Sequence, residues 1–103
     1  MNRIAIFFKL KEGKAQGYKK MHDEIWPQMT EILDIAGFRN YTIWRKDDML
    51  FAYYEIKDEQ RAEIILSESS VYARWRECME EFVWKDPITG QKEWRMENMF
   101  THE

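Results

Sequence analysis

Two adjacent apolar segments constrain the fold of this chain more than any other feature. Residues 38–45 read FRNYTIWR and residues 49–56 read MLFAYYEI, with only the polar residues KDD between them. This pattern predicts a β-hairpin. In the second segment one alternation carries Leu50, Ala52, Tyr54 and Ile56, and the other carries Met49, Phe51 and Tyr53 before it ends at Glu55. Alternate residues of a strand point to opposite faces, so both faces of this hairpin need a cover.

The segment before the hairpin predicts a strand and a long, interrupted helix. Residues 3–10, RIAIFFKL, are apolar on both alternations and indicate a strand. Apolar residues then recur at steps of three or four from about Gln16 to Ala36. Pro27 lies inside this pattern, and it predicts a kink or a fresh helix start near Trp26. Gly37 is expected to end the helix.

The segment after the hairpin predicts two shorter helices and a last strand. Asp58 can cap the first helix, and Ser69 or Ser70 can cap the second. Residues 92–100, KEWRMENMF, indicate the last strand. The order is therefore β-α-β-β-α-β with a divided second helical region. It predicts a single domain over residues 1–103 with a ferredoxin-like α+β sandwich, an antiparallel sheet with helices on one face.

A sheet of this kind has one face that its own helices leave open. Because the hairpin is apolar on both alternations, we expect a second copy of the chain to cover the open face. The prediction is a homodimer of the dimeric α/β-barrel type, with the two sheets facing each other.

Composition excludes several classes of function. The net charge is −3, from 16 basic and 19 acidic residues, which favours neither nucleic acid nor anionic lipid as a partner. The hairpin also lacks the glycine-containing basic signature of an RNA-recognition module.

The sequence HDE at residues 22–24 is not the zinc motif HExxH, so we expect no metal site. The single cysteine, Cys78, and an N-terminal apolar run too short to span a bilayer indicate a cytoplasmic protein.

The strongest candidate for chemistry is His22, one of two histidines in the chain. Tyr18 precedes it by four residues, so both side chains lie on one face of the predicted helix and point toward the sheet. Imidazole titrates near pH 6.5 and can both give and take a proton at neutrality. The alternative is a histidine that is satisfied within the core.

Other candidates are polar or aromatic residues on the expected inner surface. Tyr41, with Asn40 beside it, offers directed hydrogen bonds in an apolar pocket. Trp75 has an indole face that can stack on the C–H face of a sugar, and Arg76 follows about 100° further around the helix. Packing alone is the alternative for each. The acids Glu55 and Glu97 lie near strand ends, where either can pair with an arginine or serve as a second proton-transfer group.

These residues together resemble the L-rhamnose mutarotase family. The resemblance covers nearly the whole chain. Its most specific part is the spacing Y-x3-H-x3-W-P, here Tyr18, His22 and Trp26-Pro27, followed by Asn40-Tyr41 and LFAYYEI. It implies a ferredoxin-like fold, a dimer, no cofactor, and interconversion of the α and β anomers of L-rhamnose or a close 6-deoxy sugar.

The resemblance also implies residue roles. The family's proton donor corresponds to His22, and its sugar contacts correspond to Tyr18, Tyr41 and a tryptophan pair. Here Trp75 is followed by Arg76 where many members have a second tryptophan, so the preferred sugar stays open. Two alternatives to a monosaccharide mutarotase also stay open. One is a cofactor-free oxygenase on the same fold, and the other is a small-ligand-binding module without catalysis.

Overall fold

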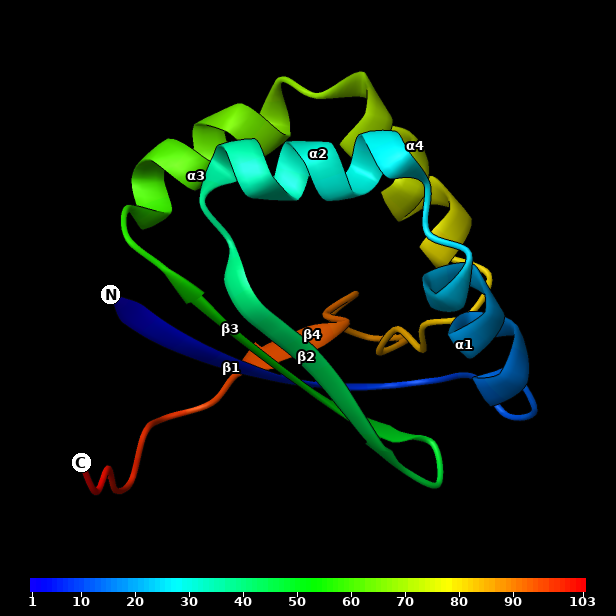
Figure 1. The fold of residues 1–103 in the computed structure, drawn as a ribbon. Coiled ribbons are helices and arrows are strands. Elements are labelled where there is room, and N and C mark those ends of the chain that lie inside the picture. Colours follow the sequence, from blue (N-terminus) through cyan, green and yellow to red (C-terminus); the bar gives the residue numbers. More distant parts are fainter.

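The computed structural model describes residues 1–103, and its elements follow the predicted order (Figure 1). The elements are β1 Asn2–Lys9, α1 Ala15–Asp23, α2 Pro27–Ala36, β2 Arg39–Lys46, β3 Met49–Ile56, α3 Glu59–Ser67, α4 Ser70–Met79 and β4 Glu93–Arg95.

The four strands form one antiparallel sheet in the order β2-β3-β1-β4. The helices lie over one face of this sheet, and Figure 1 shows no element over the other. The α+β ferredoxin-like architecture predicted from the element order is confirmed. We call the face beneath the helices the inner face and the opposite one the outer face.

The inner face carries the core. One cluster of buried residues comprises Ile4, Ala36, Ile56 and Ala62, and a second comprises Leu10, Tyr18, Leu50 and Phe82. Their strand members are the inward residues of β1 and β3, where Ile4 lies opposite Tyr54 and Phe8 lies opposite Leu50. Burial of this alternation holds the helices on the sheet and leaves the other alternation uncovered.

The helical segment over residues 16–36 is interrupted by a fresh helix start after Trp26, as Pro27 predicted, and forms two helices. Pro27 occupies the first position of α2, where its missing N–H costs no hydrogen bond. Trp26 before it is extended, with ψ of 135°, as the residue before a proline prefers. Gly37 ends α2 with a φ of 91°, as expected. The break turns the chain between α1 and α2 (Figure 1).

The remaining helix boundaries follow local signals as well. The side chains of Asp58 and Ser69 cap α3 and α4 by accepting from the N–H groups of Arg61 and Tyr72. Gly17 lies within α1 because a Cβ there would approach a ring carbon of Phe82 to 2.7 Å. No helix combines the length and the apolar character that crossing a bilayer requires.

The prediction of a last strand over residues 92–100 is wrong beyond Arg95. Strand β4 comprises only Glu93–Arg95, and one further hydrogen bond joins the N–H of Met96 to the carbonyl of Ala5. The chain then leaves the edge of β1, and Met99 and Phe100 are more than 80% exposed. Their apolar character suggested a strand, but within this chain they have no surface to pack against.

Candidate active site

His22 lies in the last turn of α1, within an aromatic cluster. The centre of its ring is 4.2 Å from that of Tyr18 and 5.3 Å from that of Trp75, which it meets edge-on. Its Nδ1 is 2.9 Å from the carbonyl oxygen of Tyr18. A carbonyl can only accept, so Nδ1 carries the hydrogen and donates it. In the neutral imidazole, Nε2 therefore holds a free lone pair.

Burial lowers the pKa of His22 below its ordinary value of 6.5. The hydrogen bond to the Tyr18 carbonyl and the charge of Asp23 oppose this effect, but both are smaller. The ring is therefore neutral near pH 7 and can accept a proton at Nε2.

Two tryptophans form the wall beside His22. The indole of Trp75, on α4, is only 6% exposed and meets the ring of Trp26 edge-on, with 5.2 Å between their centres. Trp26 comes from the junction before Pro27, so the break between α1 and α2 places it there. Most of the Trp75 surface is therefore buried by packing, as the alternative interpretation expects. One of the rings that it packs against is His22.

Tyr18 and Tyr41 come from opposite layers and lie close enough for their hydroxyls to interact electrostatically. Tyr18 is buried and comes from α1, whereas Tyr41 comes from β2. Burial raises the pKa of both hydroxyls. A charge on Tyr41 raises the pKa of Tyr18 further. Tyr41 is 42% exposed as a whole residue. Its ring packs against those of Phe38 and Tyr54, so the exposed part of the residue lies at the edge strand away from them.

Three residues that the sequence did not single out raise the pKa of Tyr41 further, after burial: Tyr72, Tyr54 and Glu93. Glu93 lies opposite Phe8 in the sheet and therefore faces inward. Its charge raises the pKa of Tyr41, Tyr54 and Tyr72, and in each case burial has the larger effect. The pairing register of β4 is the signal that identifies Glu93, and residues 92–100 alone do not contain it.

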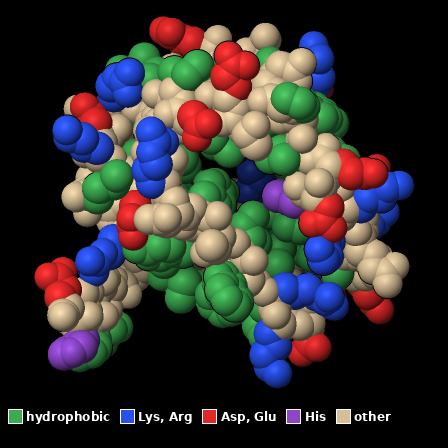
Figure 2. All heavy atoms as spheres, in the orientation of Figure 1, with side chains coloured by type: hydrophobic (Ala, Val, Ile, Leu, Met, Phe, Trp, Pro, Cys, Tyr) green, Lys and Arg blue, Asp and Glu red, His purple; other side chains and the backbone are tan.

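Arg76 lies at the edge of this region. It is exposed, and its guanidinium carbon is 5.8 Å from the centre of the Tyr72 ring. Its charge opposes the rise that burial causes in the pKa of Tyr72. The space-filling view shows a hollow between the helix layer and the sheet, with a histidine side chain at its rim and hydrophobic side chains around it (Figure 2).

The acids considered as second proton-transfer groups are not in this region. Glu55 faces outward and accepts hydrogen bonds from Asn40 and Tyr53, and Glu97 is exposed beyond β4. Neither pairs with an arginine. Arg95 instead binds Glu59, with an N–O distance of 2.8 Å, and Arg45 donates to the carbonyl of Asp47.

No three side chains of His, Cys, Asp or Glu gather to hold a metal ion.

Two further hollows lie outside the His22 cluster. A groove of about 270 Å³ borders the site, between α2 and the start of β2, and includes Tyr41 and Phe38. A larger one, of about 630 Å³, lies at the start of α3 and is lined mainly by polar residues, including Asp58 and Arg61. His22 lines neither.

Fold and site together define a ferredoxin-like α+β protein with a histidine among aromatic rings and tyrosine hydroxyls. A family model described as L-rhamnose mutarotase matches residues 3–102. The chain belongs to the L-rhamnose mutarotase family. The predicted family and the predicted isomerase activity on L-rhamnose are confirmed by this membership.

Individual relatives agree with this assignment. The chain is 37% identical over 89 residues to an L-rhamnose mutarotase from Listeria monocytogenes, which covers 84% of this chain and 85% of that one. A solved structure, the L-rhamnose mutarotase from Formosa agariphila, matches the full length of both chains with 25% identity and a TM-score of 0.83.

More distant structures share the fold alone. A putative antibiotic biosynthesis monooxygenase from Nitrosomonas europaea is 14% identical, covers 97% of this chain and 100% of its own, and has a TM-score of 0.65. A dimeric ferredoxin-like protein from an uncultured marine organism is 18% identical, covers 98% and 91%, and has a TM-score of 0.59.

Proposed function

We propose that His22 moves the proton in the interconversion of the α and β anomers of L-rhamnose or a close 6-deoxy sugar. The observation that carries this proposal is the geometry of the imidazole. Its Nδ1 is held by the Tyr18 carbonyl, and its other nitrogen is free in an aromatic wall that suits a sugar ring.

In the proposed reaction Nε2 of His22 takes the proton of the anomeric hydroxyl. The bond between C1 and the ring oxygen breaks, C1 becomes a carbonyl, and the ring oxygen receives a proton from the hydroxyl of Tyr18 or Tyr41. Rotation about the C1–C2 bond presents the other face of the carbonyl. The ring then closes with each proton returned, so the enzyme ends unchanged. General acid–base help of this kind contributes about 10²–10⁴-fold.

The protonation states support these roles. Burial lowers the pKa of His22, which favours the neutral base, and it raises the pKa of both tyrosines, which keeps their hydroxyls protonated as donors. Near pH 7 the resting protein therefore holds a neutral base and protonated hydroxyl donors together.

The remaining residues of the site are proposed to bind the sugar. Trp75 provides an indole wall beside the histidine, and Tyr18 and Tyr41 orient hydroxyl groups. Arg76 lies exposed beside Tyr72, so we assign it a contact at the mouth of the site and an influence on which sugar is preferred.

The outer face supports the proposal that the protein is a homodimer. Trp44 is 68% exposed and Phe51 is 39% exposed on adjacent strands, and the rings of Phe7 and Phe51 lie 5.5 Å apart on this face. A second copy placed sheet to sheet would bury them. We also propose a reducing, cytoplasmic location for this domain, since its only cysteine, Cys78, is a free thiol.

The test is saturation transfer between the two anomeric proton signals of L-rhamnose in the presence of the purified protein. Exchange faster than with heat-denatured protein supports the proposal. The same assay on L-fucose and on a uronic acid measures sugar preference. If no aldose shows added exchange, but calorimetry shows that a uronic acid binds, the protein is a binding module and the proposed function is wrong.

A further inference from the structure

The strand that carries Tyr41 is irregular at one point. The pairing of β2 with β3 shifts between Arg39 and Thr42, so one extra residue lies on β2. Asn40 sits in this bulge with a φ of 52°, in the left-handed region that few residues other than glycine and asparagine adopt. A bulge redirects the residues beside it, and here the next residue is Tyr41.

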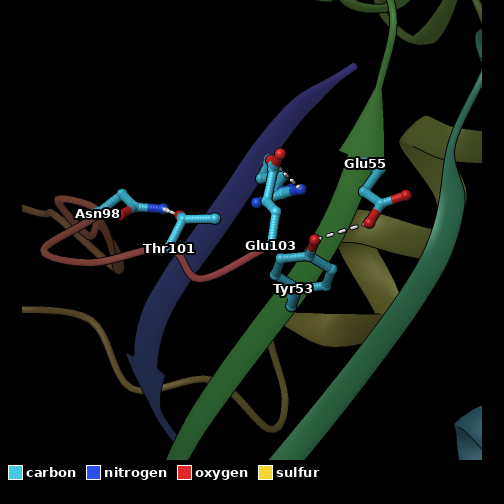
Figure 3. Close-up of polar contacts among 6 residues, drawn as sticks. Tyr53, Glu55, Asn98, Thr101 and Glu103 are labelled. Carbon is cyan, nitrogen blue, oxygen red and sulfur yellow. Dashed lines mark hydrogen bonds and ion pairs between the residues drawn. The ribbon is translucent and has the colours of Figure 1, made fainter.

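A hydrogen-bonded clamp on the outer face holds the bulge. Nδ2 of Asn40 donates to Oε1 of Glu55 at 2.8 Å, and the hydroxyl of Tyr53 donates to Oε2 of the same carboxylate at 2.7 Å. Figure 3 shows the second bond, between two residues of β3 on the same face. Both bonds favour the ionised form and lower the pKa of Glu55, the Tyr53 bond more strongly.

On the inner side, Tyr41 packs against two other rings, which themselves lie 4.6 Å apart. Its centre lies 5.7 Å from that of Phe38, with the planes nearly parallel, and 5.2 Å from that of Tyr54. The ring therefore rests on this aromatic pair. It shares its face with Ile43, which lies opposite the buried Ala52, and the bulge directly before it fixes its backbone. A change of one residue in the register would turn Tyr41 to the outer face.

We propose that Asn40 and Glu55 are positioning residues that act across the sheet to hold the Tyr41 hydroxyl in the sugar site. The inference rests on the proposed function in one respect, that Tyr41 contacts the sugar. Asn40 and Glu55 do not touch the sugar themselves, because Glu55 faces outward and the clamp lies on the opposite side of β2 and β3 from His22.

The test removes each half of the clamp. Asn40→Gly deletes the amide but keeps a residue that accepts a positive φ, so it separates the hydrogen bond from backbone strain. Glu55→Ala deletes the acceptor. Loss of the clamp, which orients a sugar-binding group, should raise KM about 3–10-fold, with kcat within about twofold when Tyr18 and not Tyr41 is the proton donor to the ring oxygen. Glu63→Ala, which removes an exposed carboxylate without a partner on α3, is the matched control and should change neither.

Coupling to Tyr41 distinguishes positioning from a general loss of stability. The double variant Asn40→Gly/Glu55→Ala should raise KM no more than Glu55→Ala alone, because Glu55→Ala already removes the Asn40 bond. In a Tyr41→Phe background, Glu55→Ala should have no further effect on KM. Additive effects in that background, or an unchanged KM in both single variants, would overturn the inference.

A spectroscopic readout keeps the inference separate from the proposed function. The Cζ resonance of Tyr41 in a ¹³C-tyrosine-labelled protein should shift in Asn40→Gly while that of Tyr18 stays in place. An unmoved Tyr41 signal contradicts the clamp whether or not the protein turns over sugar. Absence of anomer exchange in the wild-type protein, with a shifted Tyr41 signal, contradicts the proposed function and leaves the clamp supported.

Discussion

The two faces of the sheet are made by the same strands but have different surroundings. On the inner face, Leu50, Ala52 and Ile56 are almost fully buried beneath the helices. On the outer face, alternate residues of the same hairpin remain open, and Trp44 is 68% exposed. On the inner side, tyrosine hydroxyls and the histidine of α1 supply polar groups. The outer face presents mainly aromatic carbon.

This difference shows how one alternation can serve two purposes. Residues one position apart on β3, Phe51 and Ala52, belong to different faces because side chains alternate along a strand. The covered face can hold an organised site, since the helices fix its groups. No helix fixes the uncovered face, and apart from the Asn40–Glu55–Tyr53 clamp its apolar surface is what a second subunit would need.

The largest expected effect is on the outer face. Phe51→Glu places a charge at the centre of the proposed subunit contact, where both copies would meet it. Close like charges at an interface cost several kcal/mol, so the dimer dissociation constant should rise at least about 100-fold. Analytical ultracentrifugation measures this change. Ile64→Glu, on an exposed part of α3, is the control, and a wild-type monomer would show that the outer face has no such role.

On the inner face, the largest effect on stability is expected from Trp75. Trp75→Ala removes a buried indole that packs on His22 and Trp26, and such truncations cost about 3–5 kcal/mol in the free energy of unfolding. Urea denaturation measures the loss. Trp75→Phe should lose less than half as much unfolding free energy as Trp75→Ala. Equal losses in the two variants would show that packing volume is not the cause.

Acidification should weaken the site through His22. Because burial lowers its pKa in the folded protein, the unfolded chain takes up a proton first as the pH falls below about 6.5. Both the free energy of unfolding and the exchange rate should fall in that direction, the rate by about tenfold per pH unit below the folded pKa. A rate that increases on acidification would indicate an imidazolium donor instead of a neutral base.

The smallest effect is expected at the mouth of the site. Arg76→Trp restores the second tryptophan that the family resemblance implies, and it should change KM for L-rhamnose by about 2–3-fold with little change in stability, since Arg76 is exposed. Parallel assays with L-rhamnose and a uronic acid measure the preference. Identical KM ratios in the two proteins would exclude Arg76 from substrate selection.

Local signals in the sequence predicted most of the fold. Pro27 and Gly37 marked helix boundaries that the structure confirms, and Asp58 and Ser69 cap helices as expected. The end of the last strand was not predictable in this way. The apolar residues Met99 and Phe100 continue the strand pattern, and only the partner strand determines where pairing stops.

The site was predictable in part for a similar reason. His22 and Tyr18 are neighbours on one helix, so their spacing indicated that they meet. The contribution of Glu93 depends on its register with Phe8, and the contribution of Asn40 depends on a bulge that its own residue type does not reveal. Both features arise from pairing between distant segments, which sequence periodicity does not specify.

The measurement that tests the central claim most directly is anomer exchange of L-rhamnose by saturation transfer in wild-type protein, His22→Ala and His22→Gln. Glutamine retains a donor for the Tyr18 carbonyl but cannot accept a proton near neutrality. We predict that both variants keep the wild-type circular dichroism spectrum and lose about 10²–10⁴-fold of the enzyme-dependent exchange rate. Wild-type exchange in a folded His22→Gln protein would contradict the assignment of His22 as the proton-transfer group.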